Sequence, residues 1–141
     1  VVEHKELTPN EVQSIFLEHF VNLRTPLELN EYHFIREGEV FKVMLSTKYE
    51  GKVNNTLADG KGRLDAVSNA IKECYNLNYE LTNYVEHNLE STSKAEAAAY
   101  VSVKFNEKEY WGTGIHDDII CASIYALISA INNALNDNEN N

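Results

Sequence analysis

The residues of this sequence best suited to catalysis or metal binding are five histidines and two cysteines, and their spacing does not form a site. The histidines show no His-x-His pair, no HExxH motif and no cysteine neighbour at zinc spacing; they are His4, His19, His33, His87 and His116. Glu86 and His87 are adjacent, and adjacent residues of a strand point to opposite faces, so they do not form an acid–base pair. No GxSxG elbow is present. We therefore expect no catalytic residue, no metal and no cofactor in this chain.

The two cysteines have the surroundings of structural residues. Cys74 and Cys121 each lie in an apolar segment with helical spacing. This placement is typical of small core residues, not of a disulfide framework or of a thiol activated by basic neighbours. We expect both side chains to pack in the core.

One turn has the features of an anion-binding site. Gly60, Lys61 and Gly62 precede a segment of helical spacing, and the first backbone N–H groups of a helix are free to bind a carboxylate or a phosphate. The competing explanation is that the two glycines only supply the positive φ of a tight turn. In the second half of the chain the corresponding position carries Asp117 and Asp118, which we expect to cap the helix and begin its first turn. Any anion site is therefore expected in the first half alone.

Three predicted strands and a helix surround this turn. Apolar alternation predicts the strands and 3.6-residue spacing predicts the helix, over Leu27–Ile35, Val40–Tyr49, Lys52–Leu57 and then from the glycine turn to Cys74. The same order follows again over Tyr79–Asn88, Ala97–Phe105, Glu109–Ile115 and the helix Asp117–Leu135. The sequence thus predicts an α+β fold of two βββα repeats.

The repeat is also visible in the residues themselves. A shift of 56 residues aligns the two halves without a gap from Ser46 to Ile71. The matched pairs are Ser46 with Ser102, Lys48 with Lys104, Tyr49 with Phe105, Leu64 with Ile120, Ala66 with Ala122, Ala70 with Ala126 and Ile71 with Leu127. Such repetition indicates a duplicated unit that buries its apolar face against its copy.

The expected domain boundaries are 1–25 for a linker helix, 26–136 for the duplicated domain and 137–141 for a disordered tail. The linker is predicted from the helix-start signals of Thr8-Pro9-Asn10-Glu11, which apolar residues follow at helical spacing. The tail is polar throughout. Because the chain begins with Val1, we expect it to be a piece excised from a longer protein.

Composition excludes several classes of partner. The 141 residues are 43% apolar, which is enough for one core, and the formal net charge of -10 repels nucleic acids and anionic lipid surfaces. No apolar run approaches the ~20 residues that span a bilayer, and the start lacks a secretory pattern, so we expect a soluble, cytoplasmic protein. The predicted helix Ile119–Leu135 is apolar nearly all round, which predicts a homodimer because one small sheet cannot cover it.

Four motifs, taken in order, resemble the regulatory domain of 2-isopropylmalate synthases. They are Gly60-Lys61-Gly62-Arg63-Leu64-Asp65-Ala66-Val67, Tyr84-Val85-Glu86-His87, Ala95-Glu96-Ala97-Ala98-Ala99-Tyr100 and Trp111-Gly112-Thr113-Gly114-Ile115. The resemblance extends from Pro26 to Asn133, and Leu7–Val21 is similar to the helical linker that follows the catalytic barrel in that family.

The resemblance implies an allosteric domain of two βββα units, a homodimer, and feedback inhibition by leucine held near the dimer axis between the repeats. The effector pocket that it implies consists of Gly60, Gly62, Leu64, Leu81, Tyr84, Ala95, Ala97 and Ile115. Catalysis would belong to a barrel of the parent chain, an acyltransferase that condenses acetyl-CoA with 2-oxoisovalerate at a divalent metal. Arg63 and Asn88 depart from the residues usual in the family, which leaves the identity of the branched-chain effector open.

Two alternatives remain at this point. One is the isoleucine-sensing domain of a citramalate synthase, which the catalytic half would distinguish. The other is a stand-alone amino-acid-sensing or dimerisation module, which an open reading frame ending shortly before Val1 would favour.

Overall fold

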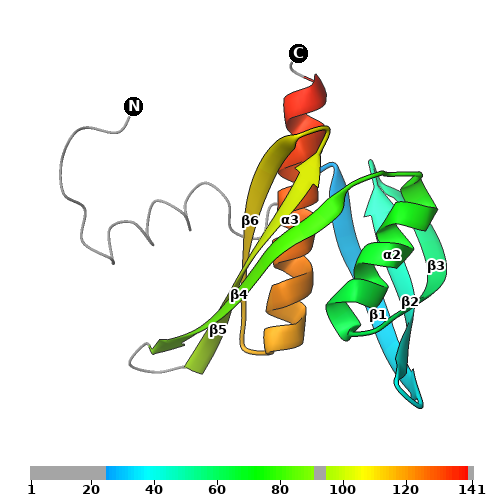
Figure 1. Ribbon diagram of the computed structural model, residues 1–141, viewed down its shortest axis with the longest axis vertical. Coiled ribbons are helices and arrows are strands. Elements are labelled where there is room, and N and C mark those ends of the chain that lie inside the picture. Colours follow the sequence, from blue (N-terminus) through cyan, green and yellow to red (C-terminus); the bar gives the residue numbers. More distant parts are fainter. Residues whose placement is uncertain (1–24, 91–94, 140–141) are drawn as a thin grey trace.

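The computed structural model describes residues 25–90 and 95–139, which form two units of the same construction. The first unit consists of β1 (Leu27–Glu37), β2 (Val40–Tyr49), β3 (Lys52–Gly60) and α2 (Arg63–Tyr75). The second consists of β4 (Glu80–Glu90), β5 (Ala95–Phe105), β6 (Lys108–His116) and α3 (Ile119–Glu139). Each unit has one antiparallel three-stranded sheet, and the two helices lie between the two sheets (Figure 1). The predicted α+β fold of two βββα repeats is confirmed; the predicted linker helix lies outside the described residues except for Thr25.

The hairpins show the duplication in the backbone. The β2–β3 turn is formed by Glu50 and Gly51, and the β5–β6 turn by Asn106 and Glu107, all four with positive φ. Two-residue turns with positive φ at both positions match the right-handed twist of the strands that they join. The two turns are 56 residues apart, which is the shift that aligns the two halves of the sequence.

α2 covers one face of the first sheet. The inward positions of the central strand alternate as Val43, Leu45 and Thr47, and all three are buried. The helix meets them with a stripe of small and apolar residues at helical spacing: Ala66, Val67, Ala70 and Ile71. The opposite face of this sheet has no covering element among the described residues.

α3 packs against β6 at very short range because two facing residues are glycines. A Cβ on Gly112 would lie 2.2 Å from the backbone nitrogen of Ala130, and one on Gly114 would lie 2.0 Å from the carbonyl oxygen of Ala122. Only glycine permits a backbone to approach this closely. Ala99 of β5 is buried in the same core, so part of the alanine-rich segment of β5 serves tight helix packing.

The homodimer was predicted on the ground that one small sheet cannot cover α3, and the structure contradicts that reason. α3 contacts β6, β5, β1 and α2 of its own chain, and its large apolar residues are almost fully buried: Ile124, Leu127, Ile128 and Ile131. No second copy is needed to cover this helix. Its segment Ile119–Asp137 is long and apolar enough to cross a membrane, contrary to the sequence expectation, but most of that segment is buried as a core helix.

The end of α3 differs from the expected domain boundary. The helix continues to Glu139, past the boundary expected at residue 136. Asp137 accepts hydrogen bonds from Lys108 and from the hydroxyl of Tyr110, each at 2.6 Å. These contacts attach the last turn of α3 to the start of β6.

Candidate functional site

A cavity of about 360 Å³ lies where the two units meet, and we call it the inter-unit cavity. The first unit contributes Phe34, Phe41 and residues 62–65 at the start of α2. The second unit contributes side chains of β4 and α3: Tyr84, Glu86, Ile120, Ser123 and Ile124. Small-molecule sites typically have volumes of about 300–1,000 Å³. Because both units supply its wall, neither repeat could form this cavity alone.

The start of α2 opens onto the cavity without a side-chain cap. Gly62 is the N-cap residue, and its carbonyl accepts the first helical hydrogen bond from the N–H of Ala66 at 3.0 Å. The Asp65 carboxylate turns backward and accepts from the N–H of Lys61 at 3.1 Å. The N–H groups of the first turn have no partner inside the helix. Together with the helix dipole they favour an anion at this end of the cavity.

Neither glycine of this turn has the positive φ that the competing explanation required. Gly62 has φ −136° and ψ 172°, an extended conformation that any residue adopts, and a Cβ there would meet nothing within 4 Å. Gly60 is needed for another reason, because a Cβ on it would lie 2.3 Å from the backbone nitrogen of Ala66. Gly60 therefore lets β3 pass close to the helix, while Gly62 leaves open space at the helix start.

A bulge in β4 determines which of its side chains face the cavity. The β4–β5 register shifts between Leu81 and Asn83, so Leu81 and Tyr84 lie on the same face although they are three residues apart. Both positions pair with buried valines of β5. Glu86 follows two residues after Tyr84 and shares its face, as the alternation of a strand requires.

The Tyr84 hydroxyl connects Glu86 to α3. It donates to the Glu86 carboxylate, and its oxygen lies 2.6 Å from the Ser123 hydroxyl. The Ser123 hydroxyl also donates to the carbonyl of Ile119, 2.7 Å away, so it contacts both that carbonyl and the Tyr84 oxygen. Burial, and then the hydrogen bond to Glu86, raises the pKa of Tyr84 to about 12, which keeps this phenol protonated. The three side chains form a chain of contacts that ends in a carboxylate at the cavity.

The rest of the cavity wall is mainly apolar. It is formed by Phe34, Phe41, Leu64, Ile120 and Ile124. The Arg63 guanidinium lies 5.2 Å from the centroid of the Phe41 ring, which holds a positive charge at the helix start. The cavity thus combines an anion-binding end, a carboxylate on the opposite unit and an apolar surface. This combination suits a small zwitterion that carries an apolar side chain.

Three of the eight residues implied by the resemblance line the inter-unit cavity: Gly62, Leu64 and Tyr84. Two others lie beside it along the chain. Gly60 ends β3 against Ala66, and Leu81 packs against the core from the same face of β4 as Tyr84. Five of the eight residues therefore belong to the two segments that border the cavity, the turn at the start of α2 and the strand β4.

The other three predicted residues belong to β5 and β6. Ala95 begins β5, where it pairs with Glu90. Ala97 pairs with His116, whereas Ile115 pairs with Ala98, so Ala97 and Ile115 lie on opposite faces of the second sheet. The side chains of Ala97 and Ile115 therefore do not point toward a common space, and neither lines the cavity; the side chain of Ala95 lies outside those that the structure describes.

Sequence reasoning missed several residues of the cavity. Glu86 had a usable signal, because it stands two residues after Tyr84 on a predicted strand and so shares its face. Phe34, Ile120 and Ser123 had none. They come from elements far apart in the sequence, and only the docking of one unit on the other brings them together.

The corresponding helix start of the second unit is closed by its own side chain. The Asp118 carboxylate accepts from the N–H of Ile120 at 3.0 Å, which caps α3. Gly62 provides no such cap for α2. The predicted asymmetry between the two turns is confirmed.

No group of three potential metal ligands among His, Cys, Asp and Glu occurs within residues 25–90 and 95–139. Cys121 is buried in α3 and Cys74 half-buried in α2, and both are free thiols.

Comparison with known proteins matches residues 6–135 to the family described as the LeuA allosteric (dimerisation) domain. The sequence is 39% identical over 135 residues to a 2-isopropylmalate synthase of Desulfitobacterium hafniense, which covers 95% of this chain and 24% of that protein. It is 39% identical over 137 residues to one of Helicobacter hepaticus, with 92% and 25% covered. One of Clostridium acetobutylicum is 33% identical over 133 residues, with 90% and 24% covered. The chain spans about a quarter of the length of these relatives.

Proposed function

Because the chain belongs to the LeuA allosteric (dimerisation) domain family, we propose that it binds leucine and confers feedback inhibition on a 2-isopropylmalate synthase. The observation that supports the proposal most directly is the inter-unit cavity, whose polar and apolar groups are arranged for an apolar α-amino acid. The chain by itself is then a regulatory unit, and catalysis belongs to the rest of the parent protein.

In this proposal the uncapped start of α2 binds the carboxylate of leucine. The free N–H groups of the first turn and the helix dipole are complementary to an anion, and Arg63 adds a full positive charge. Gly62 leaves room for the carboxylate because it has no Cβ. The capped start of α3 offers no equivalent place, so one leucine binds per chain.

The ammonium group of leucine then meets Glu86 on the opposite side of the cavity. Tyr84 orients this carboxylate, and Ser123 orients Tyr84 from α3. The isobutyl group packs on the apolar wall formed by Phe34, Leu64, Ile120 and Ile124. Binding would therefore connect the two units through one small molecule.

We extend the proposal to the parent protein from what the family resemblance implies. The activity regulated would be the condensation of acetyl-CoA with 2-oxoisovalerate in the cytoplasm, at a divalent metal held by a catalytic barrel elsewhere in the parent chain. The domain would act as a homodimer, in keeping with the family description.

A thermal-shift measurement tests the ligand. A molecule that binds only the folded chain at a hundredfold excess over its Kd stabilises it by about 2.7 kcal/mol. We expect leucine to raise the melting temperature, with smaller shifts for isoleucine and valine. A larger shift with isoleucine would favour the citramalate synthase alternative, and no shift with any of the three would contradict the proposal.

A further inference from the structure

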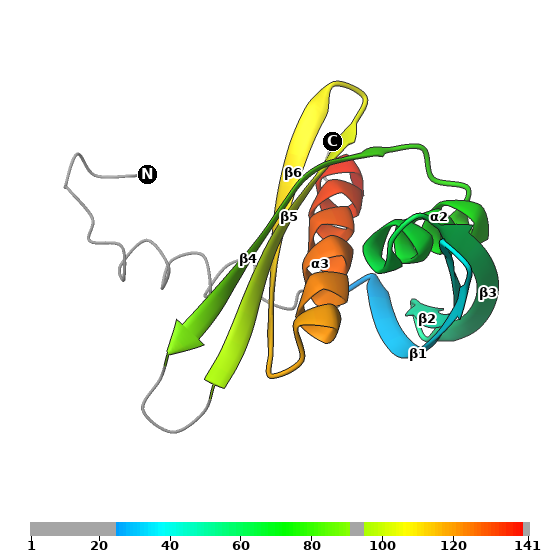
Figure 2. The same ribbon diagram turned by 60° about the horizontal axis from the view of Figure 1, so that its bottom comes forward.

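The outward face of the second sheet, on the side away from α3, has buried side chains although no described element covers it. Gly112 and Gly114 face α3, so the residues of β6 that alternate with them point outward. With their partners on β5 they form what we call the rear face: Ala98, Tyr100, Trp111, Thr113 and Ile115. Ala98 and Thr113 are 0% exposed, and the other three are half-buried. Figure 2 shows α3 on the opposite side of this sheet and no other described helix or strand on the rear side.

The first sheet is an internal reference for this burial. Met44 pairs with Leu57 on its outward face, and the shift of 56 residues places this pair on the rear-face pair of Tyr100 and Thr113. Leu57 is 57% exposed and Met44 is 48% exposed, whereas the smaller Thr113 has no exposed surface at the matching position. The position in the repeat therefore does not bury Thr113, so a further element must cover the rear face.

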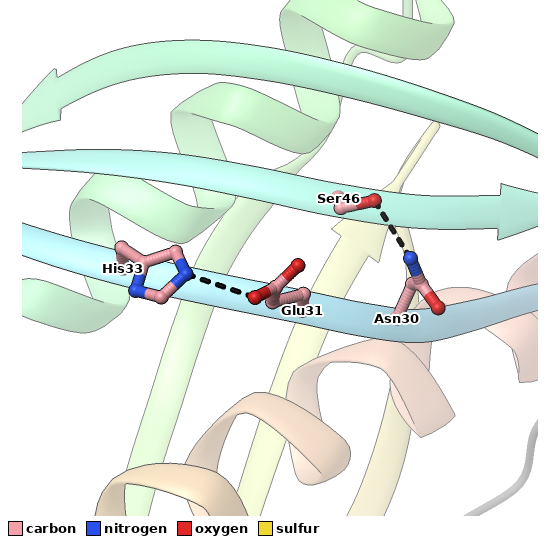
Figure 3. Close-up of polar contacts among 4 residues, drawn as sticks. All are labelled: Asn30, Glu31, His33 and Ser46. Atoms are coloured by element: carbon pink, nitrogen blue, oxygen red, sulfur yellow. Dashed lines mark hydrogen bonds and ion pairs between the residues drawn. The ribbon is translucent and has the colours of Figure 1, made fainter.

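The composition of the two outward faces differs in the same direction. Figure 3 shows the face of the first sheet, where polar side chains bond to one another: the Glu31 carboxylate lies 3.0 Å from His33, and the Asn30 amide donates to Ser46. Three further polar residues of that face correspond to apolar residues of the rear face, which are Lys42 with Ala98, Asn55 with Trp111, and Asp59 with Ile115. Contiguous apolar surface of this kind is typical of a face that another element covers.

The Thr113 hydroxyl shows that the rear face is closed to water at its centre. Its oxygen is buried and has no hydrogen-bond partner within residues 25–90 and 95–139. A buried hydroxyl without a partner costs free energy, and water would supply that partner if it reached this point. The covering element must therefore pack closely against the strands.

The segment Thr8–Val21 of the same chain has the pattern that the rear face requires. It lies outside the described residues, and its sequence predicts a helix whose apolar stripe consists of Val12, Ile15, Phe16 and Phe20. Such a helix gains most of its stability by docking this stripe on an apolar surface. Fourteen helical residues extend over about 21 Å, and the nine residues of β6 extend over about 30 Å. The strand can therefore support the whole helix.

The place where this segment joins the described part of the chain is close to the rear face. The Asn136 amide of α3 donates to the carbonyl of Thr25 at 3.2 Å, and one turn earlier Asn133 donates to the carbonyl of Trp111 at 2.6 Å. β6 is the edge strand of its sheet, so the way around it is open to a short connection. Residues 22–24 can span about 10 Å. The outward face of the first sheet is within similar reach, but Met44 there remains exposed.

We infer that Thr8–Val21 packs as an amphipathic helix on the rear face of its own chain, with its apolar stripe against Tyr100 and Trp111. The second sheet then carries this helix on one face and the cavity side chains Tyr84 and Glu86 on the other. The inference does not depend on which ligand the inter-unit cavity binds.

Trp111 provides a direct readout, because it is the single tryptophan of the sequence and belongs to the rear face. Acrylamide quenching and the emission maximum of Trp111 are measured in the chain and in variants of the segment. Phe16→Asp places a carboxylate in the apolar stripe, which opposes docking because a buried charge without a partner is unfavourable. Ser14→Asp is the matched control, since it adds the same charge on the opposite side of the predicted helix.

We expect Phe16→Asp to shift the emission of Trp111 to longer wavelength and to raise its quenching constant toward that of the urea-unfolded chain. Ser14→Asp should keep the values of the unmodified chain. Circular dichroism establishes that each variant is folded, and Phe16→Ala, which removes the ring without adding a charge, takes the place of Phe16→Asp if that variant does not fold.

Three results would overturn the inference. The first is a folded Phe16 variant in which Trp111 is quenched as weakly as in the unmodified chain. The second is an equal rise in Ser14→Asp, which would mean that the predicted stripe does not face the sheet. The third is quenching of the unmodified chain that increases on dilution, which would mean that a second copy covers the rear face.

Discussion

The side-chain amide of Asn132 forms two hydrogen bonds with the backbone of Leu27, 105 residues earlier in the sequence. Its Oδ1 accepts from the N–H of Leu27 and its Nδ2 donates to the carbonyl of the same residue, both at 2.8 Å. Both residues are fully buried. This pair attaches the first strand of the first unit to the helix of the second, so it joins the two repeats on the side where β1 begins.

Replacing Asn132 by leucine should destabilise the fold, because the buried N–H and carbonyl of Leu27 would each lose a partner. The cost is about 1–3 kcal/mol for each group left unpaired. Urea denaturation measures it, and Asn136→Ala is the control, since Asn136 lies one turn later and donates to the exposed carbonyl of Thr25. Equal stabilities for the two variants would show that the Asn132 contact does not hold the units together.

Gly112 and Gly62 should respond oppositely to substitution. Gly112→Ala places a Cβ 2.2 Å from the backbone of α3, so the helix must move away from β6, at a cost of about 3 kcal/mol or more.

Gly62→Val has neither a clash nor a positive φ, so its free energy of unfolding should stay within about 0.5 kcal/mol of that of the unmodified chain. The valine side chain would, however, fill the space proposed for the leucine carboxylate. Urea denaturation and leucine titration of Gly62→Val check both expectations; a stable variant with unchanged affinity would remove the helix start from the site.

The stability of the fold should fall in alkaline solution because of Tyr79. Its hydroxyl is buried and bonded to Ser68, and burial raises the pKa of Tyr79. The unfolded chain then loses this proton near pH 10 while the folded chain keeps it, so the free energy of unfolding decreases above pH 10 by about 1.4 kcal/mol per pH unit. Below pH 10 both states hold the proton and this contribution is constant. Urea denaturation from pH 8 to pH 11, compared with Tyr79→Phe, measures the effect, and identical slopes for the two proteins would contradict the assignment.

The leucine affinities of two variants should show whether leucine binds in the inter-unit cavity or near the end of the β4–β5 hairpin. Ile124→Ala removes part of the apolar wall, and we expect it to weaken leucine binding by the loss of apolar contact, about 2 kcal/mol. Ala97→Leu changes a buried residue that does not line the cavity, so it should lower stability by about 1–3 kcal/mol but leave the affinity unchanged. The reverse result would place the effector near Ala97, as the resemblance implied.

Local patterns in the sequence were enough to predict the elements of both units. The alternation from Val43 to Tyr49 specified a half-buried strand, and the helical spacing after Gly62 specified α2. The shift of 56 residues then predicted that the second half repeats the first, and the two hairpin turns confirm it. These features depend on neighbours a few residues away, which is why a single sequence contains them.

The cavity could be predicted only in part, because it depends on contacts between distant segments. The bulge between Leu81 and Asn83 turns Leu81 to the face of Tyr84, and no turn or glycine signal marks it. The covering of α3 within its own chain was missed for the same reason. Its apolar circumference shows that every side is buried, but it does not show whether β1 and α2 or a second copy buries it.

The central claim is that the inter-unit cavity binds leucine between the start of α2 and Glu86. Isothermal titration calorimetry of leucine into the chain, and into Glu86→Gln, tests it most directly. Glutamine keeps the size of the side chain and its acceptor oxygen but removes the charge that would face the ammonium group. We predict one leucine per chain, and a dissociation constant for Glu86→Gln at least about tenfold higher, since a charge-assisted hydrogen bond contributes about 1.5–3 kcal/mol. Saturable leucine binding with the same affinity in both proteins, or no binding heat to the folded unmodified chain, would contradict the account.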